Sequence, residues 1–113
     1  MNDEIKSAME QVREELDTYI VSLSDTKTER RAIRQAIIGG NAITNVIESY
    51  HGSEWADKIG SEMSQQIVNE LARREAWLDR EISRFKDTIK TLTANLTKYE
   101  AIAEAEAKAT KNA

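Results

Sequence analysis

Residues 68–103 read VNELARREAWLDREISRFKDTIKTLTANLTKYEAIA. The apolar residues in this stretch recur at alternating intervals of three and four, with one interruption at Glu75. They are Val68, Leu71, Leu78, Ile82, Phe85, Ile89, Leu92, Leu96, Tyr99 and Ala103. This spacing is the heptad pattern of α-helices that wind around one another, because it lines up the apolar side chains on one helix face. The chain also contains no proline, the residue that breaks helices most strongly, so we predict an all-α protein.

A second heptad pattern begins near the N-terminus and runs from Ile5 to Leu23. Its phase continues as far as Ile47, although polar residues occupy some positions. Gly52 and Ser53 separate the two patterns, and these residue types favour the end of one helix and the start of the next. We therefore predict a single domain, folded as a long antiparallel helical hairpin with coiled-coil packing. The expected segments are a first arm over about 3–50, a turn at 50–53, a second arm over about 54–108 and a frayed tail at 104–113.

The seam between the two arms follows from the heptad positions. Folding the chain near Tyr50 places Ile5 opposite Leu96 and Leu23 opposite Leu78, since antiparallel helices pair successive seam positions. The predicted hairpin seam consists of Ile5, Met9, Val12, Leu16, Tyr19, Leu23, Leu78, Ile82, Phe85, Ile89, Leu92 and Leu96. Every layer of this expected seam is apolar.

The tripeptide Gly39, Gly40 and Asn41 interrupts the apolar part of the first arm. Glycine and asparagine readily adopt left-handed backbone conformations, so the tripeptide favours a break or kink of the helix at 39–41. The alternative is a continuous helix, in which the missing side chains let another helix approach closely.

Near the expected turn, both arms are apolar on more than one side, and such helices pack against more than one neighbour. We expect a second copy of the chain to cover this surface, so that a homodimer completes a four-helix bundle. The predicted oligomer interface is Ile33, Ile37, Ile38, Ile43, Val46, Ile47, Trp55, Ile59, Met63 and Ile67. The alternative is a parallel dimer of nearly continuous helices, which the turn residues Gly52 and Ser53 disfavour.

Residues that catalyse reactions or bind cofactors are scarce in this chain. It contains no cysteine and one histidine, His51, and it has neither a phosphate-binding loop nor a nucleophile elbow. Glu48 and His51 form a Glu-x-x-His step of the kind found in di-iron bundles, but the adjacent Gly52 favours a solvated turn histidine. We therefore predict that the protein is not an enzyme and has no catalytic residue, cofactor or metal ion.

The charges of the chain bear on its partners. A net charge of −4 disfavours general binding to nucleic acids, which needs a cationic surface. A local basic cluster at Lys27, Arg30, Arg31 and Arg34 still offers candidate phosphate or partner contacts, and Trp77 is a candidate partner anchor.

The leading hypothesis is a non-enzymatic, oligomerising interaction protein that binds a protein partner through its helical faces. An adaptor, an inhibitor or an assembly accessory of phage or mobile-element type would fit this architecture. The alternative is a nucleic-acid-associated protein that uses the cluster from Arg30 to Arg34. The apolar runs are shorter than the ~18 residues of a membrane-spanning helix, and the start of the chain is acidic, so we expect a cytoplasmic protein without membrane contact.

Overall fold

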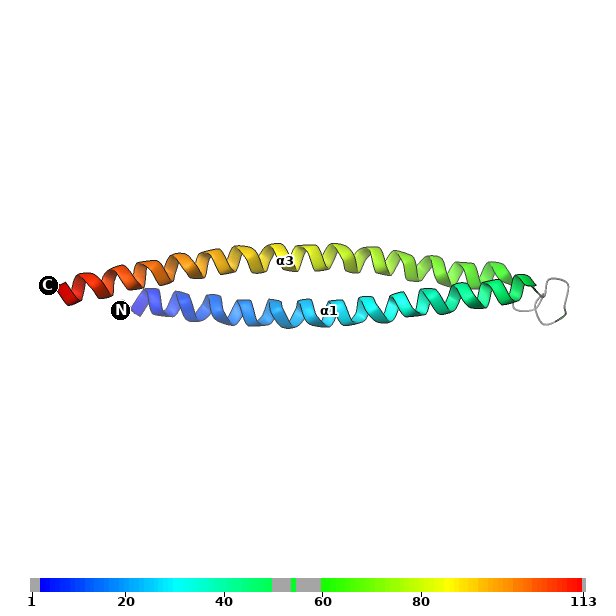
Figure 1. The fold of residues 1–113 in the computed structure, drawn as a ribbon, viewed down its shortest axis with the longest axis horizontal. Helices are drawn as coiled ribbons and strands as arrows, with labels where there is room; N and C mark the ends of the chain where they lie inside the picture. Colours follow the sequence, from blue (N-terminus) through cyan, green and yellow to red (C-terminus); the bar gives the residue numbers. More distant parts are fainter. Residues whose placement is uncertain (1–2, 50–53, 55–59, 113) are drawn as a thin grey trace. The chain divides into compact units, whose positions relative to one another are not determined.

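The computed structural model describes residues 3–49, 54 and 60–112. Two α-helices contain almost all of them: α1 covers Asp3–Ser49 and α3 covers Ser61–Asn112. The two helices lie side by side and run in opposite directions, as a hairpin (Figure 1). The prediction of an all-α helical hairpin is therefore confirmed.

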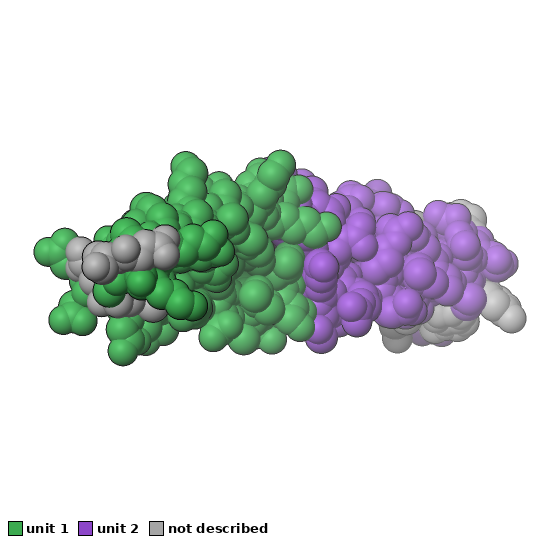
Figure 2. All heavy atoms as spheres, turned by 60° about the vertical axis from the view of Figure 1, so that its left-hand side comes forward, with its two compact units in different colours: residues 1–25, 83–113 green, residues 26–82 purple. Residues whose placement is uncertain are grey.

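The chain divides into two compact units, each of which contains one segment of either helix (Figure 2). Unit 1 comprises residues 1–25 and 83–113, and unit 2 comprises residues 26–82. In both units, the segment of α1 packs against the segment of α3 along a seam of its own.

The seam of unit 1 consists of residues that the heptads predict. Met9 and Ala103 are buried in it, and Tyr19 packs on Phe85 with ring centroids 5.9 Å apart. The other seam side chains are half-buried, because two helices alone cannot enclose them. These side chains are Ile5, Val12, Leu16, Leu23, Ile89, Leu92, Leu96 and Tyr99.

The seam of unit 2 mixes apolar residues with small and polar ones. Leu78 is completely enclosed, and the polar residues Thr44 and Ser64 are buried as well. The hydroxyl of Thr44 donates a hydrogen bond of 3.0 Å to the carbonyl oxygen of Gly40, which satisfies its donor inside the seam. The remaining apolar seam residues are the buried Ile37, Ile47 and Val68 and the half-buried Ile33, Leu71 and Ile82.

Helix α1 continues through residues 39–41, so the break that we expected there is wrong. A Cβ atom added to Gly40 would lie 2.7 Å from Cγ2 of Val68, which is too close for two carbon atoms that are not bonded to each other. Gly40 therefore permits the close contact between α1 and α3. This agrees with the alternative prediction of a continuous helix whose glycines let another helix approach. Among the described residues, the left-handed region is occupied by Gly60, with a φ of 72°, immediately before α3.

The contact between Gly40 and Val68 also fixes the register of unit 2. Extending the pairing expected from the sequence would place Val68 opposite Ile33, one heptad away from its observed partner. The difference arises because α1 ends at Ser49 and α3 begins at Ser61, so a longer connection joins them than the expected turn. The expected turn itself, at 50–53, lies outside the described residues.

Candidate interaction surface

A second series of apolar and small residues runs along α1 beside the seam. Its members follow one another at intervals of four, three, four and three, which is again a heptad spacing. They are Ala32, Ala36, Gly39, Ile43 and Val46, and all of them are exposed. A Cβ atom added to Gly39 would meet no atom within 4 Å, so this glycine faces open space.

A matching series on α3 contains Met63, Ile67 and Trp77, which are also exposed. Two charged residues, Glu70 and Arg74, occupy the same face of α3 between Ile67 and Trp77. Glu70 forms an ion pair with Arg73, and the guanidinium carbon of Arg74 lies 4.3 Å from the ring centroid of Trp77. Nη2 of Arg74 also lies 2.6 Å from Oε1 of Glu29, which precedes the α1 series by three residues. This ion pair shows that both series lie on the same side of the seam.

We call this surface the apolar face: Ala32, Ala36, Gly39, Ile43 and Val46 of α1 with Met63, Ile67 and Trp77 of α3. More than half of the surface of Ile43, Met63 and Ile67 is exposed. Exposed apolar residues are ordinary when scattered, but a set that gathers on one face is typical of an interaction site, here with Glu70 and Arg74 between Ile67 and Trp77.

The other side of unit 2 is mostly polar. Arg30 forms an ion pair with Asp79, and Nη1 of Arg34 lies 3.5 Å from Oε1 of Glu75. On α3, the side-chain amide of Gln65 donates a hydrogen bond of 3.1 Å to the side-chain oxygen of Asn69. Unit 2 therefore presents one apolar and one polar surface to its surroundings.

The structure separates the predicted oligomer interface into three groups. Ile37 and Ile47 are buried in the seam and Ile33 is half-buried there, so they have little surface left for a second copy. Ile38 is exposed, but outside the apolar face. The residues predicted for the interface that lie on the apolar face are Ile43, Val46, Met63 and Ile67, whereas Trp55 and Ile59 lie outside the described residues.

The basic cluster of α1 lies close to carboxylates of α3. The hydrogen bond and the charge of Asp79 raise the pKa of the Arg30 guanidinium above its ordinary value. Arg31 is exposed and Lys27 is half-buried. The carboxylates beside Arg30 and Arg34 offset part of the positive potential that a phosphate would need. This offset depends on the register between the helices, so the sequence alone did not reveal it.

A carboxylate also occupies the seam of unit 2. Glu75 interrupts the α3 heptads, and its Oε2 atom is buried without a hydrogen-bond partner among the described residues. Its Oε1 atom faces Arg34, whose side chain remains largely exposed. One uncompensated oxygen in a seam disfavours the folded state, because it loses its contact with water.

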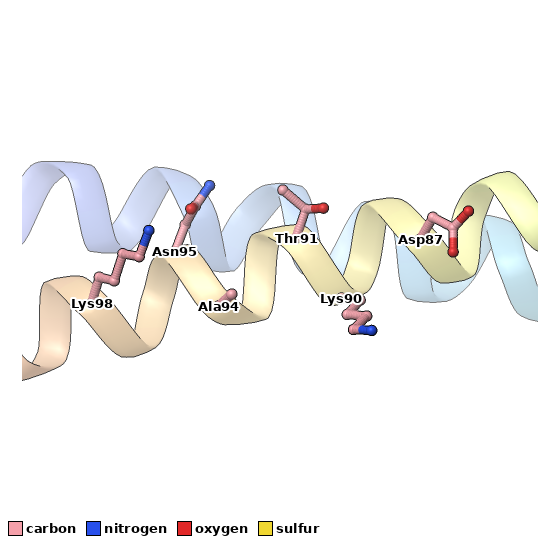
Figure 3. A pocket seen from close by; sticks show the side chains of 6 residues that line it. All are labelled: Asp87, Lys90, Thr91, Ala94, Asn95 and Lys98. Atoms are coloured by element: carbon pink, nitrogen blue, oxygen red, sulfur yellow. The ribbon is translucent and has the colours of Figure 1, made fainter.

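Unit 1 contains an open hollow on the surface of α3, lined by Asp87, Lys90, Thr91, Ala94, Asn95 and Lys98 (Figure 3). All six residues belong to one helix, and Lys90 points away from Thr91 and Asn95. The hollow brings together no combination of a nucleophile, a base and a residue that orients the base, so it suggests no reaction.

The described residues contain no group of three or more acidic, histidine or cysteine side chains placed to hold a metal ion. The candidate pair of Glu48 and His51 falls outside this search, since His51 is not among the described residues. In the described part of the chain, neither helix has a stretch long and apolar enough to cross a membrane. Comparison with protein-family models, curated proteins and solved structures gave no match.

Proposed function

We propose that the chain is a non-enzymatic, self-associating interaction protein that binds its partners through helical faces. The observation that carries this proposal is the apolar face of unit 2, where Ile43, Met63 and Ile67 are each more than half exposed. An adaptor, inhibitor or assembly accessory, of the kind that phages and mobile elements encode, would use such a face. The compartment that we propose for the chain is the cytoplasm.

The size of the apolar face supports self-association. Four aliphatic side chains and a tryptophan, each about half exposed, present on the order of 400 Å² of apolar surface. Leaving that much apolar surface in water is unfavourable, at ~25 cal/mol for each Å². A second hairpin packed on this face would complete a four-helix bundle and remove the surface from water.

The test is the mass of the protein in solution, measured by sedimentation equilibrium over a range of concentrations. We expect the chain to be a dimer or a larger oligomer, and Ile43→Lys to shift it towards the monomer, because a charge on the apolar face must be desolvated. Ile38→Lys is the matched control: Ile38 is 53% exposed and Ile43 57%, and both lie in α1. A monomeric parent chain, or an oligomer that Ile43→Lys leaves intact, would contradict the proposal.

The alternative function is nucleic-acid association through Arg30, Arg31 and Arg34. Arg31 is exposed, and the ion pairs of the other two arginines lie at the surface, where water and salt weaken them, so phosphates could compete for them. This function predicts a mobility shift with duplex or single-stranded DNA that weakens steeply with salt. It also predicts that the shift disappears when all three arginines become alanine. Absence of any salt-sensitive shift would exclude it.

A further inference from the structure

We propose that the apolar face binds the apolar face of a second copy in an antiparallel manner, so that α1 packs on the partner's α1 around a two-fold axis near residues 39–41. This inference rests on the self-association proposed above and adds the geometry of the contact. In that geometry, Ala32 at the start of the exposed α1 series of one copy lies near Val46 at the end of the same series of the other copy.

Gly39 is the first reason to expect another helix at this surface. Glycine destabilises the interior of a helix relative to alanine, so a helical glycine needs a packing or conformational reason. Gly40 has such a reason, because Val68 occupies the place of its side chain. Gly39 has neither a positive φ nor a neighbour within 4 Å of a Cβ atom. A close approach by another helix from outside would supply the missing reason.

The order of residue sizes along the series indicates an antiparallel second copy. Its first three members, Ala32, Ala36 and Gly39, are small, and its last two, Ile43 and Val46, are large. When two such series run antiparallel around residues 39–41, the large residues of each copy lie against the small residues of the other. A parallel arrangement would instead place large residues against large and leave small residues facing small. Interfaces require interior-like packing, which favours the antiparallel arrangement.

The same axis also buries two of the apolar residues of α3. Because Gly40 lies opposite Val68, residues 39–41 of α1 are level with residues 67–69 of α3. Ile67 therefore lies beside the axis, and Met63 follows one turn away. Glu70 also lies within one turn of the axis, where it keeps its ion pair with Arg73 at the edge of the contact. Ile67 and Met63 thus become buried around the same axis as the α1 series, whereas Trp77 lies ten residues beyond Ile67.

The available area is sufficient for a stable pair. A standard interface buries roughly 800 Å² on each partner, of which about 60% is apolar. The large residues of the apolar face offer on the order of 400 Å² per copy, to which the alanines and the stem of Arg74 add. A second copy therefore matches the face in area as well as in the order of its side chains.

Disulfide formation between single-cysteine variants tests this geometry, because the parent chain has no cysteine and each variant reports one position. The informative variants are Ala32→Cys and Val46→Cys. Asn45→Cys is the control for random collisions, because Asn45 is exposed, lies outside the apolar face and is more than one turn from the axis. In the antiparallel dimer, Cys at 32 of one copy lies near Cys at 46 of the other. In this dimer, residue 32 of one copy lies on the order of 15–25 Å from residue 32 of the other copy, and the same holds for residue 46. These distances are too long for a disulfide.

The two variants are mixed, allowed to exchange subunits and oxidised mildly. Mass spectrometry then identifies and quantifies the disulfide-linked dimers. We expect the mixed disulfide between Ala32→Cys and Val46→Cys to exceed the Asn45→Cys product at least about fivefold, while each variant alone stays at the control level. Efficient disulfides from each variant alone would overturn the proposal in favour of a parallel dimer.

A dimer in solution without the mixed disulfide would overturn the antiparallel geometry and leave self-association standing. A monomer in solution without any disulfide would overturn both proposals. Circular dichroism of the reduced variants serves as the folding control. Both altered positions are exposed in the hairpin, so we expect each reduced variant to keep the helix content of the parent chain.

Discussion

Gly39 and Gly40 are adjacent in α1 but have opposite surroundings. Gly40 lies against Val68 in the seam of unit 2, whereas Gly39 faces open space on the apolar face. The same substitution at these two positions therefore separates two properties of the chain: the packing of its own two helices and the intrinsic stability of α1.

We expect Gly40→Ala to destabilise the hairpin by about 1–3 kcal/mol, because the added methyl group overlaps the side chain of Val68 and α1 must move away. Gly39→Ala is the matched control, and it should stabilise the isolated hairpin by about 0.5–1 kcal/mol through the better helix propensity of alanine. Urea unfolding at the lowest usable protein concentration, where association contributes least, measures both. Equal effects at the two positions would mean that the contact between Gly40 and Val68 does not form.

Glu75 provides a second prediction for a single residue. We expect Glu75→Leu to stabilise the chain by about 1–2 kcal/mol, because leucine fills the seam position and removes a buried oxygen without a hydrogen-bond partner. The lost ion pair with Arg34 should cost little, since that arginine is largely exposed. Thermal unfolding of Glu75→Leu and of the isosteric Glu75→Gln measures the effect. A lower melting temperature for Glu75→Leu would show that the carboxylate has a stabilising partner.

At the scale of the helices, the continuity of α1 can be tested directly. We expect the amide hydrogens of Gly39, Gly40 and Asn41 to exchange as slowly as that of Ile37, because an unbroken helix keeps their backbone hydrogen bonds. Hydrogen exchange followed by NMR resolves the individual amides. Exchange at residues 39–41 that is much faster than at Ile37 and at Thr44 would restore the break that the sequence suggested.

The heptads were sufficient to predict the two helices and their packing as a hairpin. Met9 in α1 and Leu78 in α3, for example, each occupy a heptad position. The heptad positions of a helix form one apolar stripe along it. The same phase also passes through Ile37 and Ile47, and it could have separated these seam residues from Ile43 and Val46 on the second stripe. The heptad phase alone therefore assigns Ile43 and Val46 to a different stripe of α1 from Ile37 and Ile47.

Contacts between the helices could not be predicted, because they depend on the register. Any two heptad patterns can be shifted by seven residues without changing which side chains lie in the seam. The partner of Gly40, and the carboxylates beside Arg30 and Arg34, follow only once the connection between Ser49 and Ser61 fixes that shift. The true role of Gly40 therefore emerged from its contact with Val68 and not from the local preference of glycine for turns.

For the whole molecule, self-association links stability to concentration. A ligand that binds the folded state raises its apparent stability by mass action, and a second copy acts as such a ligand. We expect the melting temperature of the chain to rise by about 2–5 °C for each tenfold increase in protein concentration. In Ile67→Lys, which places a charge beside the proposed axis, the melting temperature should not depend on concentration. Ile38→Lys should behave like the parent chain, because Ile38 lies outside the apolar face. A parent chain whose melting temperature is constant over a hundredfold range would unfold as a monomer, and the apolar face would then belong to a different partner.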